Sequence, residues 1–551
     1  MSAALYVNDN HSQLFFTKKP FSPHLFLHPC HFCPPPHLQN YPDTVINENH
    51  SHLCRVASIM SPRLRTALRL FHRWIGFPAG LFLFALCFTG SLSCFSPEIQ
   101  GWMQPRTALH SPLPAMTRTG LLKAGQELKK QLDTGTFAFL KLPSPRDPVF
   151  RLWHYDGHIF LGPALAPDTG LPLTDHDVTG GTFFVTLHAS LHLPSPWGQL
   201  LTAIVGIGLL VTLLTGLWLQ LRRFLPDLLL FRPRAASQRR WLDLHLLCGT
   251  LSLPVLFIIG LSGVVLQSQK LIHMMNPPHH PSGHASRHQA RTTMPLSLSP
   301  AIIDGLTENG LRQWGTVADG FFMQTGREIG LYGPDTLHFC LQRQALTPSH
   351  PTLPPRATCP TVHGFFVGLH NLRWAGLVTR WLYCLSGLVG CLIIGSGIVL
   401  FLQSERNGLA QSERNGLAHA GTVSPCRSGL QHLYRALATA TLLGLPLATL
   451  ALFWSTRLPA PASLSTILWE EALFFGLWGV SLFHGLITRQ AARHQLGLMA
   501  VMGLGLTGLD LLTRPFHTGR PFLFGSVDGL AACLGLTSLL YLRRHQSGET
   551  A

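Results

Sequence analysis

The chain has 551 residues, of which 46% are apolar and only 12% are charged, whereas soluble domains average about 25% charged residues. Several long uncharged runs accompany this composition, so it excludes an ordinary soluble globular protein and predicts an integral membrane protein. The net charge of +16 does not indicate nucleic-acid binding, because the arginines cluster at the ends of the apolar runs, where they set helix orientation.

Residues 1–59 differ from the rest of the chain. They are rich in proline, histidine and asparagine and have no apolar period. Cys30 and Cys33 form a C-x-x-C pattern, but no second ligand pair follows at a zinc-site spacing. Met60 opens a basic segment that leads into the first apolar run. We therefore interpret 1–59 as a disordered extension, or as a translation start assigned too far upstream.

Residues 60–96 contain the first predicted transmembrane helix. The run from Trp74 to Phe95 has no charged residue, and its 22 residues at helical rise exceed the roughly 30 Å bilayer core. Four arginines precede it, which predicts a cytoplasmic start. Residues 97–183 then lie on the periplasmic side. They read as a small α+β domain, with a helix at 121–132 and strands separated by turns.

Residues 184–267 contain transmembrane helices 2 and 3, at roughly 197–221 and 241–266. Pro194 and Pro196 are expected to break helix 2 after His188. The connection between them holds six arginines and is predicted to be cytoplasmic. Residues 268–362 form a second periplasmic segment with a helix-like stretch and a hairpin at 327–342. Cys340 and Cys359 lie in this segment, where an oxidising periplasm would permit a disulfide.

The remaining predicted segments complete an eight-helix topology. They are transmembrane helix 4 in 363–402, a cytoplasmic loop with two copies of QSERNGLA in 403–435, transmembrane helices 5–8 in 436–542, and a cytoplasmic tail in 543–551. Both termini are then cytoplasmic. The predicted fold class is an all-α polytopic membrane protein with about eight transmembrane helices, two repeated two-helix units and small α+β periplasmic insertions.

The first four transmembrane segments repeat one pattern, in which a histidine at the head of a helix precedes a glycine farther along. The four pairs are His72 with Gly90, His188 with Gly216, His245 with Gly263, and His370 with Gly397. The first and third spacings are both 18 residues, and the second and fourth are 28 and 27. The chain therefore holds two copies of a two-helix unit.

Topology decides which of these histidines can meet. His72 and His245 head helices that enter from the cytoplasm, and His188 and His370 head helices that enter from the periplasm. Two facing imidazoles in an apolar helix bundle are what bis-histidine haem ligation needs, so we expect two haems, with iron bound by these two pairs. His192 is an alternative to His188, since i and i+4 share a helix face. His363 is an alternative to His370. For any one of these histidines, a headgroup or backbone contact is the competing interpretation.

Three acidic residues fall in or beside the later apolar runs, where charge is costly. Glu470, Glu471 and Asp528 could serve a proton or quinone site. The competing interpretation places the two glutamates at the membrane interface and gives Asp528 a buried hydrogen bond. No G-x-G-x-x-G pattern follows a strand, so an electron donor would be external to this chain. No catalytic residue is assigned.

Several motifs resemble the PepSY-associated transmembrane-helix family. They are FHRWIGFPAG at 71–80 with FTG at 88–90, APDTG at 166–170, FFVTLHASLHLPSPWG at 183–198 and GLHNLRWAGLVTRWLYCLSGL at 368–388. The periplasmic insertions would then be PepSY-like. Similar proteins include ferric-siderophore reductases of the bacterial inner membrane, which carry two b-type haems, so the resemblance implies that the expected haems are of the b type.

The resemblance implies an oxidoreductase that takes electrons from a cytoplasmic reductant or quinol and reduces a ferric chelate or siderophore in the periplasm. Membrane lipid is its other partner, and no nucleic acid is expected. The alternative is a non-haem transporter or accessory membrane protein whose PepSY-like domains bind a partner.

Overall fold

The computed structural model describes most of the chain from residue 61 onward. The described residues are 61–104, 116–134, 138–141, 143, 146–155, 160–173, 177–220, 230–275, 330–331, 362–371, 376–414, 425–513 and 521–546. Cys30, Cys33, Cys340 and Cys359 lie outside them, as do the expected helix near 302–314 and most of the expected 327–342 hairpin.

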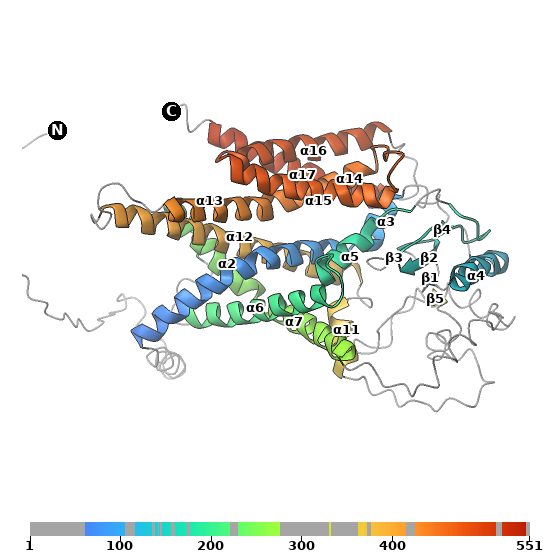
Figure 1. Ribbon diagram of the computed structural model, residues 1–551, viewed down its shortest axis with the longest axis horizontal. Helices are drawn as coiled ribbons and strands as arrows, with labels where there is room; N and C mark the ends of the chain where they lie inside the picture. Colours follow the sequence, from blue (N-terminus) through green and yellow to red (C-terminus); the bar gives the residue numbers. More distant parts are fainter. Residues whose placement is uncertain are drawn as a thin grey trace, which may run out of the picture. The chain divides into compact units, whose positions relative to one another are not determined.

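Four long helices form the central bundle: α2 (Pro62–Ser93), α6 (Trp197–Gln220), α7 (Ser237–Met275) and α12 (Leu377–Arg414). Helix α2 packs against α6 and α12, and α7 packs against the same two helices (Figure 1). Small residues permit close packing, since a β-carbon on Gly80 would already touch Ile394 at 3.4 Å. The bundle thus consists of two equivalent units, one built on α2 and α6 and the other on α7 and α12.

Each unit contains a further short helix ahead of its second long helix. These are α5 (Gly180–Ser190), which packs on α2, and α11 (Val362–Asn371), which packs on α7. Helix α5 ends because Leu191 and His192 have left-handed φ angles of 52° and 59°. Pro194 and Pro196 follow, as the predicted break in helix 2 requires. The segment predicted as helix 4 is likewise divided, between α11 and α12.

Residues after the bundle form a second group of helices. They are α13 (Pro425–Thr439), a π-helical turn η3 (Ala440–Gly444), α14 (Leu445–Ser455), α15 (Thr466–Ile487), α16 (Ala491–Thr513) and α17 (Pro521–Gln546). We call residues 425–546 the C-terminal helices. Helix α14 is almost entirely buried among its neighbours, and it shares one apolar core with residues of α2, α3 and α5.

Within the described residues, seven helices are long and apolar enough to cross a membrane. They are α2, α6, α7, α12, the α13–α14 segment, α15 and α16. The predicted all-α polytopic membrane fold is therefore confirmed. Helix α17 occupies the eighth predicted span and packs along α16. It is not among the seven, and it includes Asp528, Arg543 and Arg544.

The loop predicted at 403–435 is wrong at both ends, because α12 extends to Arg414 and α13 begins at Pro425. Helix α12 continues through the first QSERNGLA copy and ends at Arg414. Glutamine, glutamate, arginine, leucine and alanine are all good helix formers, so the duplicated segment can prolong the helix. An ion pair between Glu405 and Arg73 of α2 joins this extension to the bundle.

The polar region between α2 and α6 forms a small sheet with two helices, α3 (Ser96–Met103) and α4 (Arg118–Asp133). The strands are β1 (Ala138–Lys141), β2 (Phe150–Tyr155), β3 (Phe160–Leu161), β4 (Ala164–Leu165) and β5 (Gly330–Leu331), in the order β3-β2-β1-β5 with β4 also on β2. All pairs are antiparallel. Helix α4, which coincides with the predicted helix, packs on β1 and β2.

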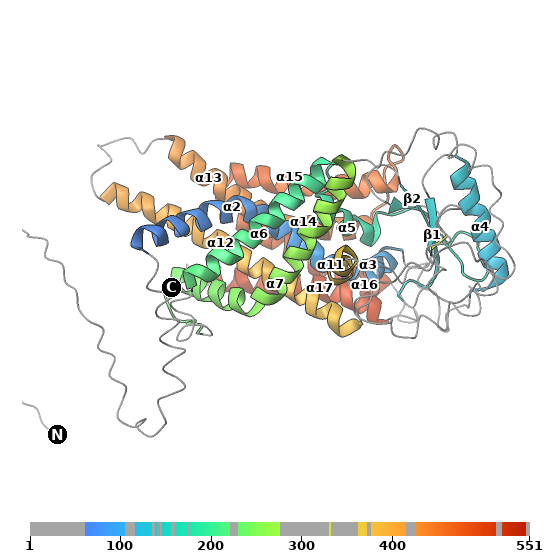
Figure 2. The same ribbon diagram turned by 90° about the horizontal axis from the view of Figure 1, so that it is seen from below.

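Strand β5 comes from the second predicted periplasmic segment. Leu331 pairs with Leu140 of β1, so two segments almost 200 residues apart in sequence share one sheet. The sequence interpretation treated the two segments separately. Short strands of this kind have no local signal for their pairing partner, which is why the joining was not predicted. Figure 2 shows the sheet beyond the end of the bundle at which α5, α11 and α3 lie.

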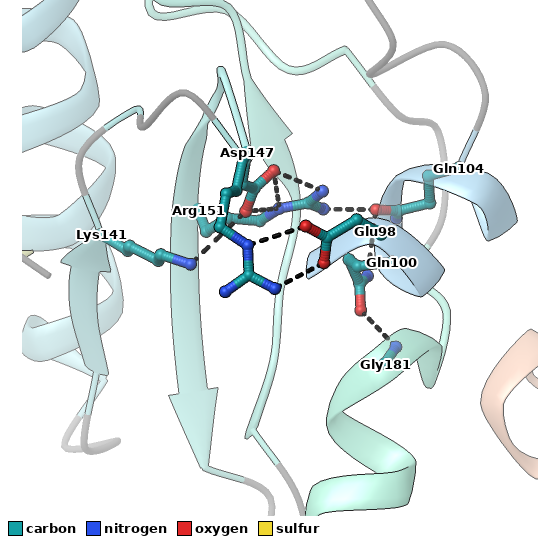
Figure 3. A network of polar contacts seen from close by, with 8 residues as sticks. Glu98, Gln100, Gln104, Lys141, Asp147, Arg151 and Gly181 are labelled. Atoms are coloured by element: carbon teal, nitrogen blue, oxygen red, sulfur yellow. Dashed lines mark hydrogen bonds and ion pairs between the residues drawn. The ribbon is translucent and has the colours of Figure 1, made fainter. Parts of the chain in front are cut away.

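A polar network joins the sheet to the bundle (Figure 3). Arg151 of β2 is fully buried, and its guanidinium donates to Asp147 at 3.0 Å and to the side chain of Gln104. The Gln104 side-chain oxygen also accepts from Gln100, 3.1 Å away. Gln100 in turn accepts from the backbone N–H of Gly181, the second residue of α5, at 3.0 Å. The network therefore runs from the sheet through α3 to α5.

Candidate functional site

Two histidine pairs lie between the helices of the central bundle. His72 of α2 faces His245 of α7, with ring centres 6.4 Å apart and ring planes at 79°. Helices α2 and α7 are the equivalent first helices of the two units. We call His72 and His245 the remote pair, because His72 lies near the beginning of α2, away from the sheet.

The second pair lies at the end of the bundle nearer the sheet. His188 of α5 faces His370 of α11, with ring centres 5.9 Å apart and ring planes at 22°. Helices α5 and α11 are again equivalent elements of the two units. We call His188 and His370 the sheet-side pair. All four histidines of the repeated pattern are thus brought together in the two combinations that topology requires.

The Nδ1 atom of each histidine is held by a neighbouring helix of its own unit. His188 Nδ1 donates to the Leu86 carbonyl at 2.9 Å, and His245 Nδ1 to that of Ile393 at 2.9 Å. His370 Nδ1 donates to the Ile259 carbonyl at 3.2 Å. His72 Nδ1 lies 2.9 Å from the hydroxyl of Thr215. A carbonyl accepts only from N–H, so the bonds of His188, His245 and His370 fix the tautomer in which Nε2 has the lone pair.

The supporting positions share one sequence element, a serine or threonine followed by glycine. The four dipeptides are Thr89-Gly90, Thr215-Gly216, Ser262-Gly263 and Ser396-Gly397. Ser262 and Ser396 bring their hydroxyls to 3.1 and 3.2 Å from the Nδ1 atoms of His370 and His245. Thr89 instead donates to the Ala85 carbonyl in its own helix, at 2.7 Å.

Each glycine of these dipeptides leaves room for one imidazole. A β-carbon would lie 2.9 Å from His188 Cε1 at Gly90, and 3.0 Å from His370 Cε1 at Gly263. It would lie 3.3 Å from His72 Cε1 at Gly216, and 3.3 Å from His245 Cε1 at Gly397. The sequence pattern linked each histidine to a glycine on the helix that it heads. In the structure the glycine that meets each ring belongs to a different helix.

Helix α2 gives a scale for the separation of the two pairs. It contributes His72 to the remote pair and Gly90 to the sheet-side pair. The 18 residues between them correspond to about 27 Å of helical rise. This distance is close to the roughly 30 Å thickness of a bilayer core, so the two pairs lie near opposite ends of a membrane-spanning helix.

The ring separations allow a simple test of what each pair could hold. An imidazole nitrogen binds a metal at about 2.0 Å, so two rings on opposite sides of one iron have centres about 6.3 Å apart. The observed 6.4 and 5.9 Å agree with this value. Among the described residues, no group of three or more His, Cys, Asp or Glu side chains could hold a metal ion. Each pair could supply two nitrogen ligands to a metal whose other ligands come from a macrocycle.

The two alternative histidines are placed differently. Nε2 of His192 lies 3.3 Å from a carboxylate oxygen of Glu471, and its ring packs on Phe183 and Phe475. It is His188 that faces His370. His192 does not share the helix face of His188, because α5 ends at Ser190 and the next two residues have left-handed backbone angles. His363 belongs to α11, but its side chain lies outside the described residues.

Two of the acidic residues of the C-terminal helices have buried hydrogen-bond partners. Glu470 is 1% exposed and accepts two hydrogen bonds from Thr179, the residue before α5. It is tolerated because both donors compensate for its loss of hydration. Asp528 accepts from Trp102 Nε1 at 3.2 Å, as the expected buried hydrogen bond requires.

The fold and these sites together define a polytopic helical membrane protein with paired histidines inside a repeated bundle. Residues 69–404, more than half of the chain, match the family described as the PepSY-associated TM region. The chain belongs to this family. The matched range begins just before His72 and includes both histidine pairs. No curated protein matches the chain.

Proposed function

We propose that this protein is a haem-carrying oxidoreductase of the bacterial inner membrane that passes electrons across the membrane to periplasmic ferric chelates, including ferric siderophores. The observation that supports the proposal is the geometry of the two histidine pairs. Their ring centres, 6.4 and 5.9 Å apart, match the separation expected for axial ligands of one iron. Two haems of the b type are therefore proposed for each chain.

The residues of the chain have separate tasks in this proposal. His72 with His245, and His188 with His370, would hold one haem each through Nε2. The carbonyls and hydroxyls at Nδ1 orient the rings and keep Nε2 available as the ligating nitrogen. Apolar helices around each pair keep water out. Haem in such a setting supplies one-electron redox chemistry, with a potential tuned by these axial ligands and their hydrogen bonds.

The direction of transfer rests on charge. Arg63, Arg65 and Arg69 precede or begin the apolar part of α2, and Arg239 and Arg240 begin α7. By the positive-inside rule, this end of the bundle is cytoplasmic and the sheet is periplasmic. The remote pair would then hold its haem at the end that faces a cytoplasmic reductant or quinol. The sheet-side pair would hold the other haem at the end that faces the ferric substrate, and both termini would be cytoplasmic.

Reduction fits the release of iron from such a substrate. Fe(III) is a hard ion that is held by oxygen ligands, and these ligands bind the softer Fe(II) less strongly. A one-electron donor at the periplasmic face would therefore free the iron without destroying the chelator. This step needs no nucleotide-binding domain in the chain, provided that the donor is external.

Haem content of the purified protein tests the proposal directly. We expect a Soret band and, by pyridine haemochrome assay against protein mass, two haems per chain. A value near zero would overturn the haem assignment, and a value near one would remove one pair. After haem is established, dithionite-reduced protein should be reoxidised by a ferric chelate but not by the matching gallium chelate, which has no accessible reduction.

The repeated architecture supports a second candidate, a non-haem transporter or accessory membrane protein. Internal repeats around a midplane site are common in transporters, and the two units here are equivalent helix by helix. In that case the purified protein would contain no haem, and the four histidines would contribute to substrate or proton binding instead. The same haem assay therefore separates the two candidates.

A further inference from the structure

Helix α5, which contains His188, does not cap its own beginning. The first N–H groups of any helix lack partners within the helix. Thr179 occupies the N-cap position, but its side chain makes no capping bond to α5. Its hydroxyl donates instead to the Glu470 carboxylate at 2.7 Å, and its backbone N–H donates to the same oxygen at 2.7 Å. Glu470 belongs to α15, one of the C-terminal helices.

A second amide at the start of α5 has its partner on the opposite side. Gly181 N–H donates to Gln100 of α3, which belongs to the polar network that reaches the sheet. A β-carbon at Gly180 would overlap the Gln100 side chain, and one at Gly181 would overlap the Ser96 carbonyl. Glycines at both positions therefore let α3 approach this closely. The start of α5 is held between a glutamine on one side and a glutamate on the other.

The C-terminal helices also pack along the length of α5. Phe183 and Phe184 are fully buried, with ring centres 4.8 Å from Phe474 of α15 and 6.0 Å from Phe453 of α14, respectively. Beyond the end of α5, His192 pairs with Glu471, the residue after Glu470. The adjacent residues Glu470 and Glu471 therefore contact both ends of α5. Glu470 binds Thr179 just before the helix, and Glu471 binds His192 just after it.

We infer that Glu470 is a positioning residue for the sheet-side histidine pair, so that the C-terminal helices set the distance between His188 and His370. This inference rests on the proposed function for its redox consequence, but the placement of α5 is independent of haem. His188 is nine residues from Thr179, about 14 Å of helix. A metal bond tolerates only about 0.2 Å of error, so a small tilt of α5 would strain or break the ligation.

The test uses the full-length protein in detergent and three variants of the contact between Glu470 and Thr179. Glu470→Ala removes both acceptor bonds, Thr179→Val removes only the hydroxyl bond, and Glu470→Gln keeps a side-chain oxygen that can accept. Asp510→Ala is the matched control, because Asp510 is a buried carboxylate of the same C-terminal helices that pairs with Arg457. It deletes a buried carboxylate elsewhere in the C-terminal helices and leaves the contact between Glu470 and Thr179 unchanged.

The first measurement is amide hydrogen exchange of peptides covering α5, which requires no haem. Loss of a helix cap should speed exchange there by roughly five- to thirtyfold in Glu470→Ala. Thr179→Val should have a smaller effect, and Glu470→Gln and Asp510→Ala should be close to wild type at α5. Unchanged exchange in Glu470→Ala, or an equal increase in Asp510→Ala, would overturn the inference.

The second measurement is redox titration with electron paramagnetic resonance of the haem-loaded protein. Glu470→Ala should shift the potential and the g values of one low-spin haem and leave the other unchanged, with recovery in Glu470→Gln. Equal shifts in both haems, or none, would contradict a positioning role. A wild-type protein without haem would refute the proposed function alone, and the exchange measurement would then decide whether Glu470 holds α5.

Discussion

Gly90 of α2 lies directly against the imidazole of His188, so that a β-carbon at residue 90 would be 2.9 Å from Cε1. The same relationship recurs at Gly216, Gly263 and Gly397, each with one histidine of the two pairs. A histidine ring thus takes the space of a missing side chain on a neighbouring helix. The position of the ring therefore depends on the helix that contains the glycine as much as on the helix that contains the histidine. Substitutions of these glycines should affect the histidine pairs without removing a histidine.

Alanine at Gly90 should displace His188. Real β-carbons essentially never approach a neighbour within 3.0 Å, so either the ring or α5 must shift. We expect Gly90→Ala to lose most of the sheet-side haem, and Gly216→Ala, with 3.3 Å available, to have a smaller effect on the remote haem. Gly76→Ala is the control on the same helix, because nothing lies within 4 Å of a β-carbon there. Haem content that is equal in Gly90→Ala and Gly76→Ala would contradict this role for Gly90.

Each histidine variant should remove only one haem, because each axial pair is confined to one end of the bundle. His370→Ala should lose the sheet-side haem, keep the remote haem reducible from the cytoplasmic side, and stop ferric-chelate reduction. His188→Ala should behave in the same way. His72→Ala should do the converse, leaving a sheet-side haem that added dithionite still reduces. Loss of both haems from a folded His370→Ala protein would show that the two sites are not separate.

Substitution of His192 separates the two candidate ligands, His188 on α5 and His192 just after its end. Its Nε2 lies 3.3 Å from Glu471 and not against His370. We therefore expect His192→Ala to retain two haems and to differ from wild type mainly in thermal stability. Haem analysis of His192→Ala beside His188→Ala provides the comparison, and a loss of haem in both variants would argue against the observed pairing.

Removing the hydroxyl of Thr215 should weaken the remote site without deleting a ligand. Partners of the second ring nitrogen typically affect metal affinity by about 10- to 100-fold. Thr215→Val leaves His72 and His245 themselves in place, so its effect should lie at the lower end of this range. Transfer of haem to excess apomyoglobin measures the loss. Thr212→Val is the control on the same helix, since that hydroxyl donates to Gly208, 2.9 Å away.

The buried ion pair of the sheet should matter more than any exposed pair. Asp147→Ala leaves the fully buried Arg151 guanidinium without its carboxylate partner, which typically costs about 3–5 kcal/mol. Lys130→Ala removes a largely exposed ion pair with Glu127 and should cost less than about 0.5 kcal/mol. Limited proteolysis between α3 and α5 should reveal the difference. Equal cleavage of both variants would show that the network in Figure 3 does not stabilise this region.

Much of the architecture follows from local sequence. Uncharged runs long enough to cross a bilayer predicted the membrane helices, because hydropathy and helical rise are properties of each segment alone. The repeated spacing of histidine and glycine identified the four histidines, and arginine-rich connections indicated which of them share a level. Even the break before α6 was visible, since proline has no N–H to donate within a helix.

The choice between His188 and His192 could not be predicted from the local sequence pattern. Both residues fit one face of a continuous helix, so their spacing alone left both possible. The end of α5 at Ser190 decides between them, and that end depends on left-handed backbone at Leu191 and His192. Nothing in the identity of a leucine or a histidine predicts that conformation, which is held by packing around α5.

Only the tertiary structure decided the contacts between distant segments. The amino-acid sequence by itself determined the membrane class, the repeat and the four histidines, because each is a matter of composition or spacing. It did not determine that Gly90 contacts the ring of His188, that Glu470 accepts hydrogen bonds at the start of α5, or that Leu331 pairs with Leu140 in the sheet. Each of these pairs joins residues about 100 to 290 positions apart. Such contacts form when helices and strands pack, and packing selects partners by complementary shape and unsatisfied hydrogen bonds rather than by sequence period.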